Sequence, residues 1–301
     1  MNIYSSISAN KMKTWLIMLC FILFITTIVY VFSKTFGQNN LSIVGFTLIF
    51  SGVISLITYY YSDKIVLKSL NAKLIEKKDN FKLYTTVENL CIAAGLPAPK
   101  IYLINDPSPN AFATGRDPNH AILCFTTGIL EKLNKVELEG VTAHELSHIK
   151  NYDIRLMSIV AILVGFIAII SDLFFRNLWF ARSNDDDNNN NANLQIIFLI
   201  LGIIFAILSP IIATLIQLAI SRKREYLADA SGALLTRYPE GLASALEKIS
   251  SDKSALKKAS NATAHLFISS PFKGKNSKQL FTNLFETHPP IEERIRILRS
   301  M

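Results

Sequence analysis

Apolar and polar stretches alternate along this chain on the length scale of membrane helices. Four segments are apolar over about the 20 residues that a helix needs to cross a hydrocarbon core, and they are 14–33, 41–62, 156–175 and 194–220. Because a second apolar run follows the first directly, without a small-residue cleavage pattern, we interpret the first as a retained anchor and not as a signal peptide. The last run would be about 40 Å long as a helix, so we expect it to tilt or to emerge into water.

The polar region between the second and third runs has the pattern of a small α+β domain. The pattern predicts a helix at 87–94 that ends at Gly95, strands at 100–104, 111–114 and 121–127, and a turn at 116–120. We therefore expect a small mixed sheet. A longer helix is predicted from Glu131 to Asn151, with a buried stripe formed by Leu133, Val136, Val141 and Leu146.

Positive charge is distributed unevenly around the four runs. The basic residues beside them are Lys11, Lys13, Lys64, Lys68, Lys73, Lys77, Lys78, Arg155, Arg222, Lys223 and Arg224. The connection after Ser33 carries one lysine, and the run from Arg182 to Asn191 is rich in Asp and Asn. Since lysine and arginine favour the cytosolic side, both termini are predicted to be cytosolic. The acidic run could bind a cation, but a solvated linker is the favoured interpretation.

This topology divides the chain into four parts. Residues 1–62 hold the first two membrane helices, 63–155 a cytosolic polar region, 156–220 the third and fourth helices with an external loop, and 221–301 a second cytosolic region. The two cytosolic parts are expected to form one domain.

Composition supports a membrane protein and excludes some other classes. Half of the residues are hydrophobic, at 50%, and the mean hydropathy is +0.31. The net charge of +8 is not arranged as a nucleic-acid surface, because no basic stretch alternates with aromatic residues. The three cysteines have no paired spacing, which indicates neither a disulfide framework nor a cysteine metal site.

The helix predicted from Glu131 to Asn151 carries a pentad with the spacing of a zinc site. In His144-Glu145-Leu146-Ser147-His148, two imidazoles stand four residues apart and can reach one tetrahedral ion from one helix face. Glu145 lies beside them, where its carboxylate can contact water on the ion. A surface helix with two ordinary histidines is the less favoured alternative. We predict one Zn²⁺ per chain.

A catalytic zinc requires a third protein ligand and an open position. Glu225 is the candidate, because it follows the fourth apolar run, where the emerging helix would reach the pentad. Asp229, one turn later, could accept a hydrogen bond from a ligating imidazole. From these residues alone, a solvated helix face paired with arginines is the stronger interpretation, since i,i+4 charge pairs are common.

With three further motifs, the chain resembles the HtpX-type membrane zinc proteases, bacterial relatives of the CAAX prenyl proteases. The resemblance covers nearly the whole length. The motifs are Asn110-Ala111-Phe112-Ala113-Thr114-Gly115, the pentad with Ile149, Asn151 and Asp153, the segment 225–232, and His288-Pro289-Pro290. It implies four transmembrane helices joined to a mostly helical cytosolic α+β zinc-protease domain with a small sheet, in a bacterial inner membrane.

The resemblance also implies roles for individual residues. His144, His148 and Glu225 would be zinc ligands, Glu145 the catalytic carboxylate, and Asp229 the partner of a ligand. His288 would lie near the substrate carbonyl oxygen, although the residues that follow it also suit the first turn of a helix. Asn110, Ala111 and Phe112 would form an edge strand that holds the substrate backbone by strand addition, and an ordinary strand with a turn is an equal alternative.

Three other residues are assigned no place in the site. His120 and His265 have no spaced partner, and we expect them to face solvent or to form local hydrogen bonds. Asp153 could orient the site, but we expect it at the membrane interface, paired beside Arg155.

The expected reaction is hydrolysis of a peptide bond by water that the zinc activates. Glu145 would take the proton and pass it to the leaving amine, and His288 would donate to the developing oxyanion. Many charges surround the pentad, which would be too costly inside lipid, so the site is expected in water beside the bilayer. The resemblance implies that the substrates are misfolded or damaged membrane proteins, cut in cytosolic segments as quality control under stress.

Two other functions remain as alternatives. A prenyl-protein protease of the CAAX type is the neighbouring enzyme. A non-catalytic zinc-binding or transport protein would need polar ligands inside the spans, and the third and fourth runs offer few. The oligomeric state is left open by the sequence.

Overall fold

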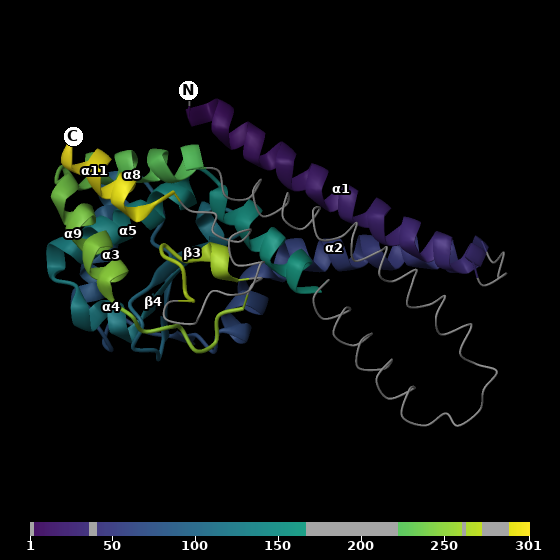
Figure 1. The fold of residues 1–301 in the computed structure, drawn as a ribbon, viewed down its shortest axis with the longest axis horizontal. Coiled ribbons are helices and arrows are strands. Elements are labelled where there is room, and N and C mark those ends of the chain that lie inside the picture. The colour runs from purple at the N-terminus through teal and green to yellow at the C-terminus, as the bar shows by residue number, and fades with distance from the viewer. Residues whose placement is uncertain (1–2, 36–40, 167–221, 261–262, 273–288) are drawn as a thin grey trace.

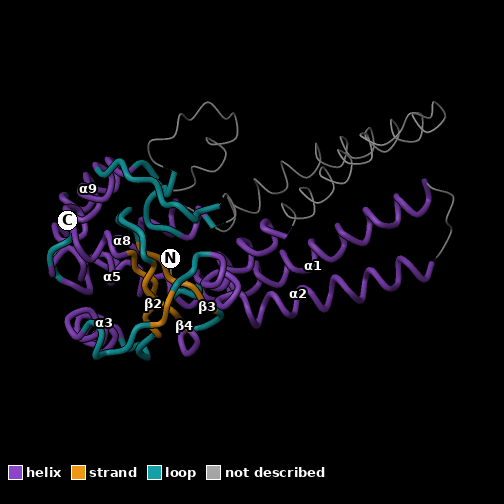
Figure 2. The backbone as a smooth tube through the Cα atoms, turned by 90° about the horizontal axis from the view of Figure 1, so that it is seen from below, coloured by secondary structure: helices purple, strands orange, loops and turns teal. Residues whose placement is uncertain are grey.

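The computed structural model describes residues 3–35, 41–166, 222–260, 263–272 and 289–301. Within them, a pair of long helices projects from one side of a mostly helical domain that contains a small sheet (Figure 1). The pair consists of α1 (Ile3–Thr35) and α2 (Leu41–Ser69), which lie side by side in both views (Figures 1 and 2).

The projecting pair contains two stretches long and apolar enough to cross a membrane. They are Ser8–Thr27 and Val44–Ser69, and only 28% and 17% of the residues in their most apolar parts are buried in the protein. The large exposed apolar side chains of the pair include Trp15, Leu16, Leu19, Leu23, Phe46, Ile49, Phe50, Val53, Leu56 and Ile57. The core helix of a soluble protein buries such residues, so this surface is typical of contact with lipid or with other helices.

The third predicted span is described only in its first part. Residues 153–166 are helical. Their apolar side chains pack against α1 in a cluster that joins Leu156, Val160 and Leu163 to Ile17 and Phe21. The remainder of that span, the predicted external loop and the predicted span 194–220 lie outside the described residues.

The sheet is mixed, as the sequence pattern predicts, and it has one strand more than the three predicted. Its strands are β1 (Lys73–Leu74), β2 (Lys100–Ile104), β3 (Ala111–Gly115) and β4 (Ala121–Thr126). The order is β1-β2-β4-β3, with β2 and β4 parallel and the other pairs antiparallel. β1 is too short to give a sequence pattern. The predicted turn between β3 and β4 is a 3₁₀ turn, Pro118–His120, capped by the Asp117 side chain.

Helices surround the sheet. They are α3 (Phe81–Ala94), α4 (Thr127–Lys132), α5 (Lys135–Lys150), α8 (Arg222–Thr236), α9 (Pro239–Ser251) and α11 (Ile291–Arg299). The core joins β3 and β4 to apolar residues of α3, α5 and α9. α3 begins at an Asn80 cap and ends at Gly95, whose φ of 67° places it in the left-handed region that glycine adopts readily.

The helix predicted from Glu131 to Asn151 is two helices. Asn134 and Glu137 form a capping box, in which each side chain bonds the other residue's backbone N–H, so a new helix starts at Lys135. The predicted buried stripe is corrected at Val136, which is 43% exposed, because Glu137 takes the inward position and pairs with Lys248. Leu133, Val141 and Leu146 are buried as predicted.

α5 lies at the centre of the helices because two glycines allow its neighbours to approach closely. A Cβ at Gly140 would lie 2.6 Å from the backbone nitrogen of Leu242 in α9. A Cβ at Gly232 of α8 would lie 3.0 Å from the backbone nitrogen of His144. The backbones of α5 and α8 therefore meet at the pentad, and this brings the carboxylates of α8 to the imidazoles.

Replacing Gly140 by alanine should destabilise the protein. The added methyl group would collide with the backbone of α9, an overpacking that typically costs about 1–3 kcal/mol and outweighs the gain of about 0.5–1 kcal/mol in helix propensity. The measurement is the midpoint of thermal unfolding in detergent. Gly52→Ala is the matched control, because nothing lies within 4 Å of the Cβ it adds. Equal midpoints for the two variants would contradict the close approach of α5 and α9.

Candidate metal centre

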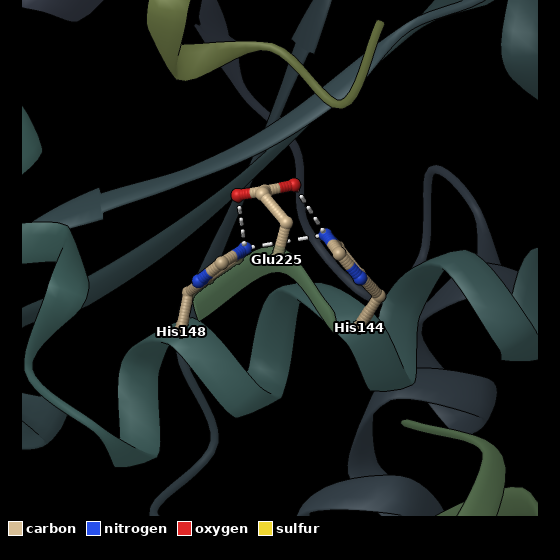
Figure 3. Close-up of side chains that lie close together, drawn as sticks. All are labelled: His144, His148 and Glu225. Atoms are coloured by element: carbon tan, nitrogen blue, oxygen red, sulfur yellow. Dashed lines mark hydrogen bonds and ion pairs between the residues drawn. The ribbon is translucent and has the colours of Figure 1, made fainter. Parts of the chain in front are cut away.

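Two helices bring three potential metal ligands together. His144 and His148 come from α5 and Glu225 from the first turn of α8, and their ligand atoms all lie within 4.8 Å of one another. Figure 3 shows the Glu225 carboxylate facing both imidazoles. All three side chains are buried. Among the described residues, this is the one group of three His, Cys, Asp or Glu side chains close enough to hold an ion.

The spacing of these atoms fits a tetrahedral ion. The two Nε2 atoms are 3.2 Å apart, and the Glu225 oxygens lie 3.5 Å from Nε2 of His148 and 3.8 Å from Nε2 of His144. Ligands at 2.0–2.1 Å from a tetrahedral zinc are themselves about 3.3 Å apart. Two nitrogens and a carboxylate are also the protein donor set of catalytic zinc sites, which keep a fourth position for water or substrate.

Each imidazole is held through its other nitrogen by a carboxylate. Nδ1 of His144 lies 2.9 Å from Asp229, and Nδ1 of His148 lies 3.1 Å from Asp153. A neutral imidazole that donates from Nδ1 carries its lone pair on Nε2, so both lone pairs point to the place where an ion would bind. The predicted contact of Asp229 with a ligating histidine is therefore present in the structure.

The two histidines differ in their affinity for protons. Burial lowers the pKa of His144, although Asp229 opposes this. Burial also acts to lower the pKa of His148, but the hydrogen bond to Asp153 and the charge of Glu225 outweigh it and raise the pKa to about 9. Binding a metal ion must displace the proton of His148, so metal affinity should decrease as the pH falls.

Glu145 lies beside this cluster and is not part of it. Its side chain is 2% exposed and accepts a hydrogen bond from the backbone N–H of Ala113 in β3. Burial, with a contribution from Glu225, raises the pKa of Glu145 to about 7. A carboxylate with a pKa near neutrality, next to a metal site, is suited to take and return protons.

Arg294 is a site residue that the sequence analysis missed. This arginine of α11 is 0% exposed, and its Nε and Nη2 donate to the two oxygens of Asp229 at 2.8 and 2.7 Å. Its Nη1 lies 3.7 Å from Glu225. Burial would raise the pKa of Asp229, but Arg294 outweighs it and holds this pKa below its usual value. No local pattern signals this role, because Glu292 and Glu293 stand beside Arg294 in the sequence while its partner Asp229 lies 65 residues away.

The structure corrects the expectation for Asp153. Its carboxylate contacts His148 and not Arg155, so it is a partner of a candidate ligand. Arg155 donates instead to the backbone oxygen of Arg116 and lies over the rings of Tyr59 and Tyr152.

The segment predicted to bind substrate forms an edge strand next to Glu145. Asn110, Ala111 and Phe112 are buried, and β3 is the last strand of the sheet. The outer side of β3 already has partners within the chain. The oxygen of Ala111 accepts from the backbone N–H of Ile268 at 3.0 Å, and the Asn110 side chain donates to the oxygen of Ser269 at 2.9 Å.

The remaining histidines lie apart or outside the described residues. His288 falls outside them, immediately before Pro289. His120 is exposed and contacts Asp117. His265 is buried, with Nε2 3.0 Å from the backbone oxygen of Met157. Neither His120 nor His265 belongs to the metal cluster.

Comparison with known proteins gives consistent matches. Residues 77–301 match the model of peptidase family M48. A protein named "Protease HtpX homolog" from Caldanaerobacter subterraneus subsp. tengcongensis is 46% identical over 299 residues, which cover 99% of this chain and 98% of that protein. A protein of the same name from Dictyoglomus thermophilum is 46% identical, over 99% of this chain and 94% of that protein. Another, from Tropheryma whipplei (strain Twist), is 45% identical, over 99% of this chain and 98% of that protein.

A solved structure gives a more distant match. The crystal structure of S. mikatae Ste24p aligns with a TM-score of 0.48 and 19% identity, over 95% of this chain and 67% of that one.

Replacing Arg294 by methionine should destabilise the protein and weaken metal binding. The change would leave Asp229 charged and buried without its main partner, and breaking a buried ion pair typically costs about 3–5 kcal/mol. The midpoint of thermal unfolding and the dissociation constant for metal measure the two effects. Arg296→Met on the exposed side of α11 is the control, with an expected change within about 0.5 kcal/mol. If Arg294→Met matched this control, Arg294 would have no part in the site.

Proposed function

The chain belongs to peptidase family M48 and is a metalloprotease, and on this premise we propose that it is a zinc endopeptidase held in a bacterial inner membrane. The observation that carries the proposal is the convergence of His144, His148 and Glu225, with Glu145 buried beside them. We propose His144, His148 and Glu225 as the ligands of one zinc ion per chain. Asp229 and Asp153 would orient the two imidazoles through Nδ1.

The proposed membrane arrangement has four transmembrane helices, with both termini and the site on the cytosolic side. The apolar exposed surface of α1 and α2 supports membrane contact. The clusters of lysine and arginine beside the apolar runs support the orientation. The two polar regions, 63–155 and 221–301, supply α5 and α8 respectively, so the proposed protease domain joins both.

Glu145 and His288 would perform the proton and charge steps. Bound zinc would supply Lewis acidity toward the scissile carbonyl and make water more acidic. Glu145 would take a proton from the attacking water and deliver it to the leaving amine, a role that its pKa of about 7 suits. His288 would donate a hydrogen bond to the carbonyl oxygen as negative charge develops there.

The proposed substrates are misfolded or damaged membrane proteins, cut in cytosolic segments as quality control. Asn110, Ala111 and Phe112 would hold the substrate backbone at the outer edge of β3, next to Glu145. Strand addition needs an extended segment, which an unfolded polypeptide offers and a folded domain does not. Since Ile268 already bonds the oxygen of Ala111, substrate would have to displace that contact.

Glu145→Gln should abolish peptide cleavage and leave metal content unchanged. The amide keeps the size of the side chain but cannot accept a proton from water. Metal content and cleavage of an unfolded model substrate are measured on full-length protein in detergent, with autolysis followed in parallel. Chelator should stop the wild type, and added zinc should restore it. Cleavage confined to prenylated peptides would favour a prenyl-protein protease, and equal cleavage by both proteins would reveal a contaminant.

His288→Ala should retain metal and lower kcat. Removal of one oxyanion donor typically reduces kcat by about 10²–10³-fold, whereas loss of a ligand would remove the metal as well. His120→Ala is the matched control, because the His120 side chain is exposed, contacts Asp117 and does not belong to the metal cluster. An unchanged kcat for His288→Ala would exclude the oxyanion role.

A further inference from the structure

Asn10 is a buried amide on the long apolar helix α1, and it contacts the metal centre indirectly. Its side chain is 3% exposed. Its Nδ2 donates to Asp153 Oδ1 at 2.7 Å and to the backbone oxygen of Asn151 at 3.0 Å, and its Oδ1 accepts from Arg224 at 3.3 Å. Two acceptors on one side and a donor on the other fix the orientation of the amide.

Asp153 joins this amide to a candidate ligand. One oxygen, Oδ2, lies 3.1 Å from Nδ1 of His148. The other, Oδ1, is held by Asn10 and by Arg224, whose Nη1 lies 3.3 Å away. Because Asp153 is only 2% exposed, these contacts decide how its carboxylate is turned. Fixing Oδ1 fixes the direction in which Oδ2 meets the imidazole.

The backbone between α5 and the next helix depends on the same amide. Asn151 ends α5, and Tyr152 has a φ of 59°, a left-handed conformation that is costly for a residue with a bulky side chain. Asp153 follows directly. The hydrogen bond from Asn10 to the oxygen of Asn151 holds this turn, and with it the position of Asp153.

We propose that Asn10 is a positioning residue of the metal centre, which acts through Asp153 to fix the tautomer and the ring orientation of His148. The inference rests on the proposed metal site and extends it, since it makes the membrane-anchor helix α1 part of that site. The Asn10 side chain contacts none of the proposed metal ligands and does not contact Glu145. A shift of α1 along its axis would move the amide away from Asp153 and change metal affinity.

The test compares four variants of the full-length chain in detergent. They are Asn10→Leu, Asp153→Asn, the double variant, and Thr14→Val. Thr14 lies one turn along α1, is 0% exposed, and its hydroxyl donates to the backbone oxygen of Asn10 in the same helix. Thr14→Val is therefore a control for altered packing of α1 that leaves the Asn10 amide in place.

The readouts are the dissociation constants for Zn²⁺ and Co²⁺, by competition with a chelator, and the visible absorption of bound Co²⁺, which reports ligand geometry.

Asp153→Asn should weaken metal binding by about 10-fold or more, as the loss of a ligand's hydrogen-bond partner does. Asn10→Leu should shift the Co²⁺ spectrum and weaken binding less, by about 3- to 10-fold. In the Asp153→Asn background, Asn10→Leu should add little further, because both act on one imidazole. Thr14→Val should resemble the wild type.

Other results would overturn the inference. Unchanged dissociation constants and spectra for Asn10→Leu, with the wild type binding metal, would refute the role of Asn10 and leave the proposed function standing. Fully additive losses, or equal losses in Thr14→Val, would assign Asn10 to general packing of α1. A wild-type chain that binds neither metal would overturn the proposed function, and the inference with it.

Discussion

The structure around the metal centre depends on a set of buried charged side chains that pair with one another. Glu145, Asp153, Glu225, Asp229 and Arg294 are all buried, together with the two imidazoles. A buried charge without a partner is too costly to keep, so each of these groups must stay near the others. Helices α5, α8 and α11 each contribute at least one member. The packing of these helices is therefore needed both for the stability of the buried charges and for the chemistry of the site. The close contact at Gly232 makes that packing possible.

The sequence predicted the parts of this arrangement that depend on local spacing. The pentad needs only the period of a helix to place His144 and His148 on one face, and the three longer strands needed only short apolar patterns. Glu225 and Asp229 required the resemblance, because their spacing alone is more typical of a solvated helix face. Family membership and the metalloprotease activity agree with that resemblance. The ligand roles of these residues remain predictions.

Residues whose role depends on distant contacts were not found from the sequence. Arg294 has acidic neighbours in the sequence, yet its partner Asp229 lies 65 residues away. Asp153 was read as part of a membrane interface because Arg155 is close in sequence, whereas its contacts are His148 and, from α1, Asn10. The break before α5 was missed because an apolar pattern continued across Leu133, and the capping box of Asn134 and Glu137 decided the boundary.

The position of Arg294 also has a consequence for the order in which the protein is made. His144 and Arg294 lie 150 residues apart, and the helix that carries Arg294 is synthesised long after the pentad. Until α11 emerges from the ribosome and docks, Asp229 lacks its guanidinium partner, and the cluster of buried charges is incomplete. A growing chain that already displays the pentad therefore still lacks the ion pair that holds Asp229 beside His144.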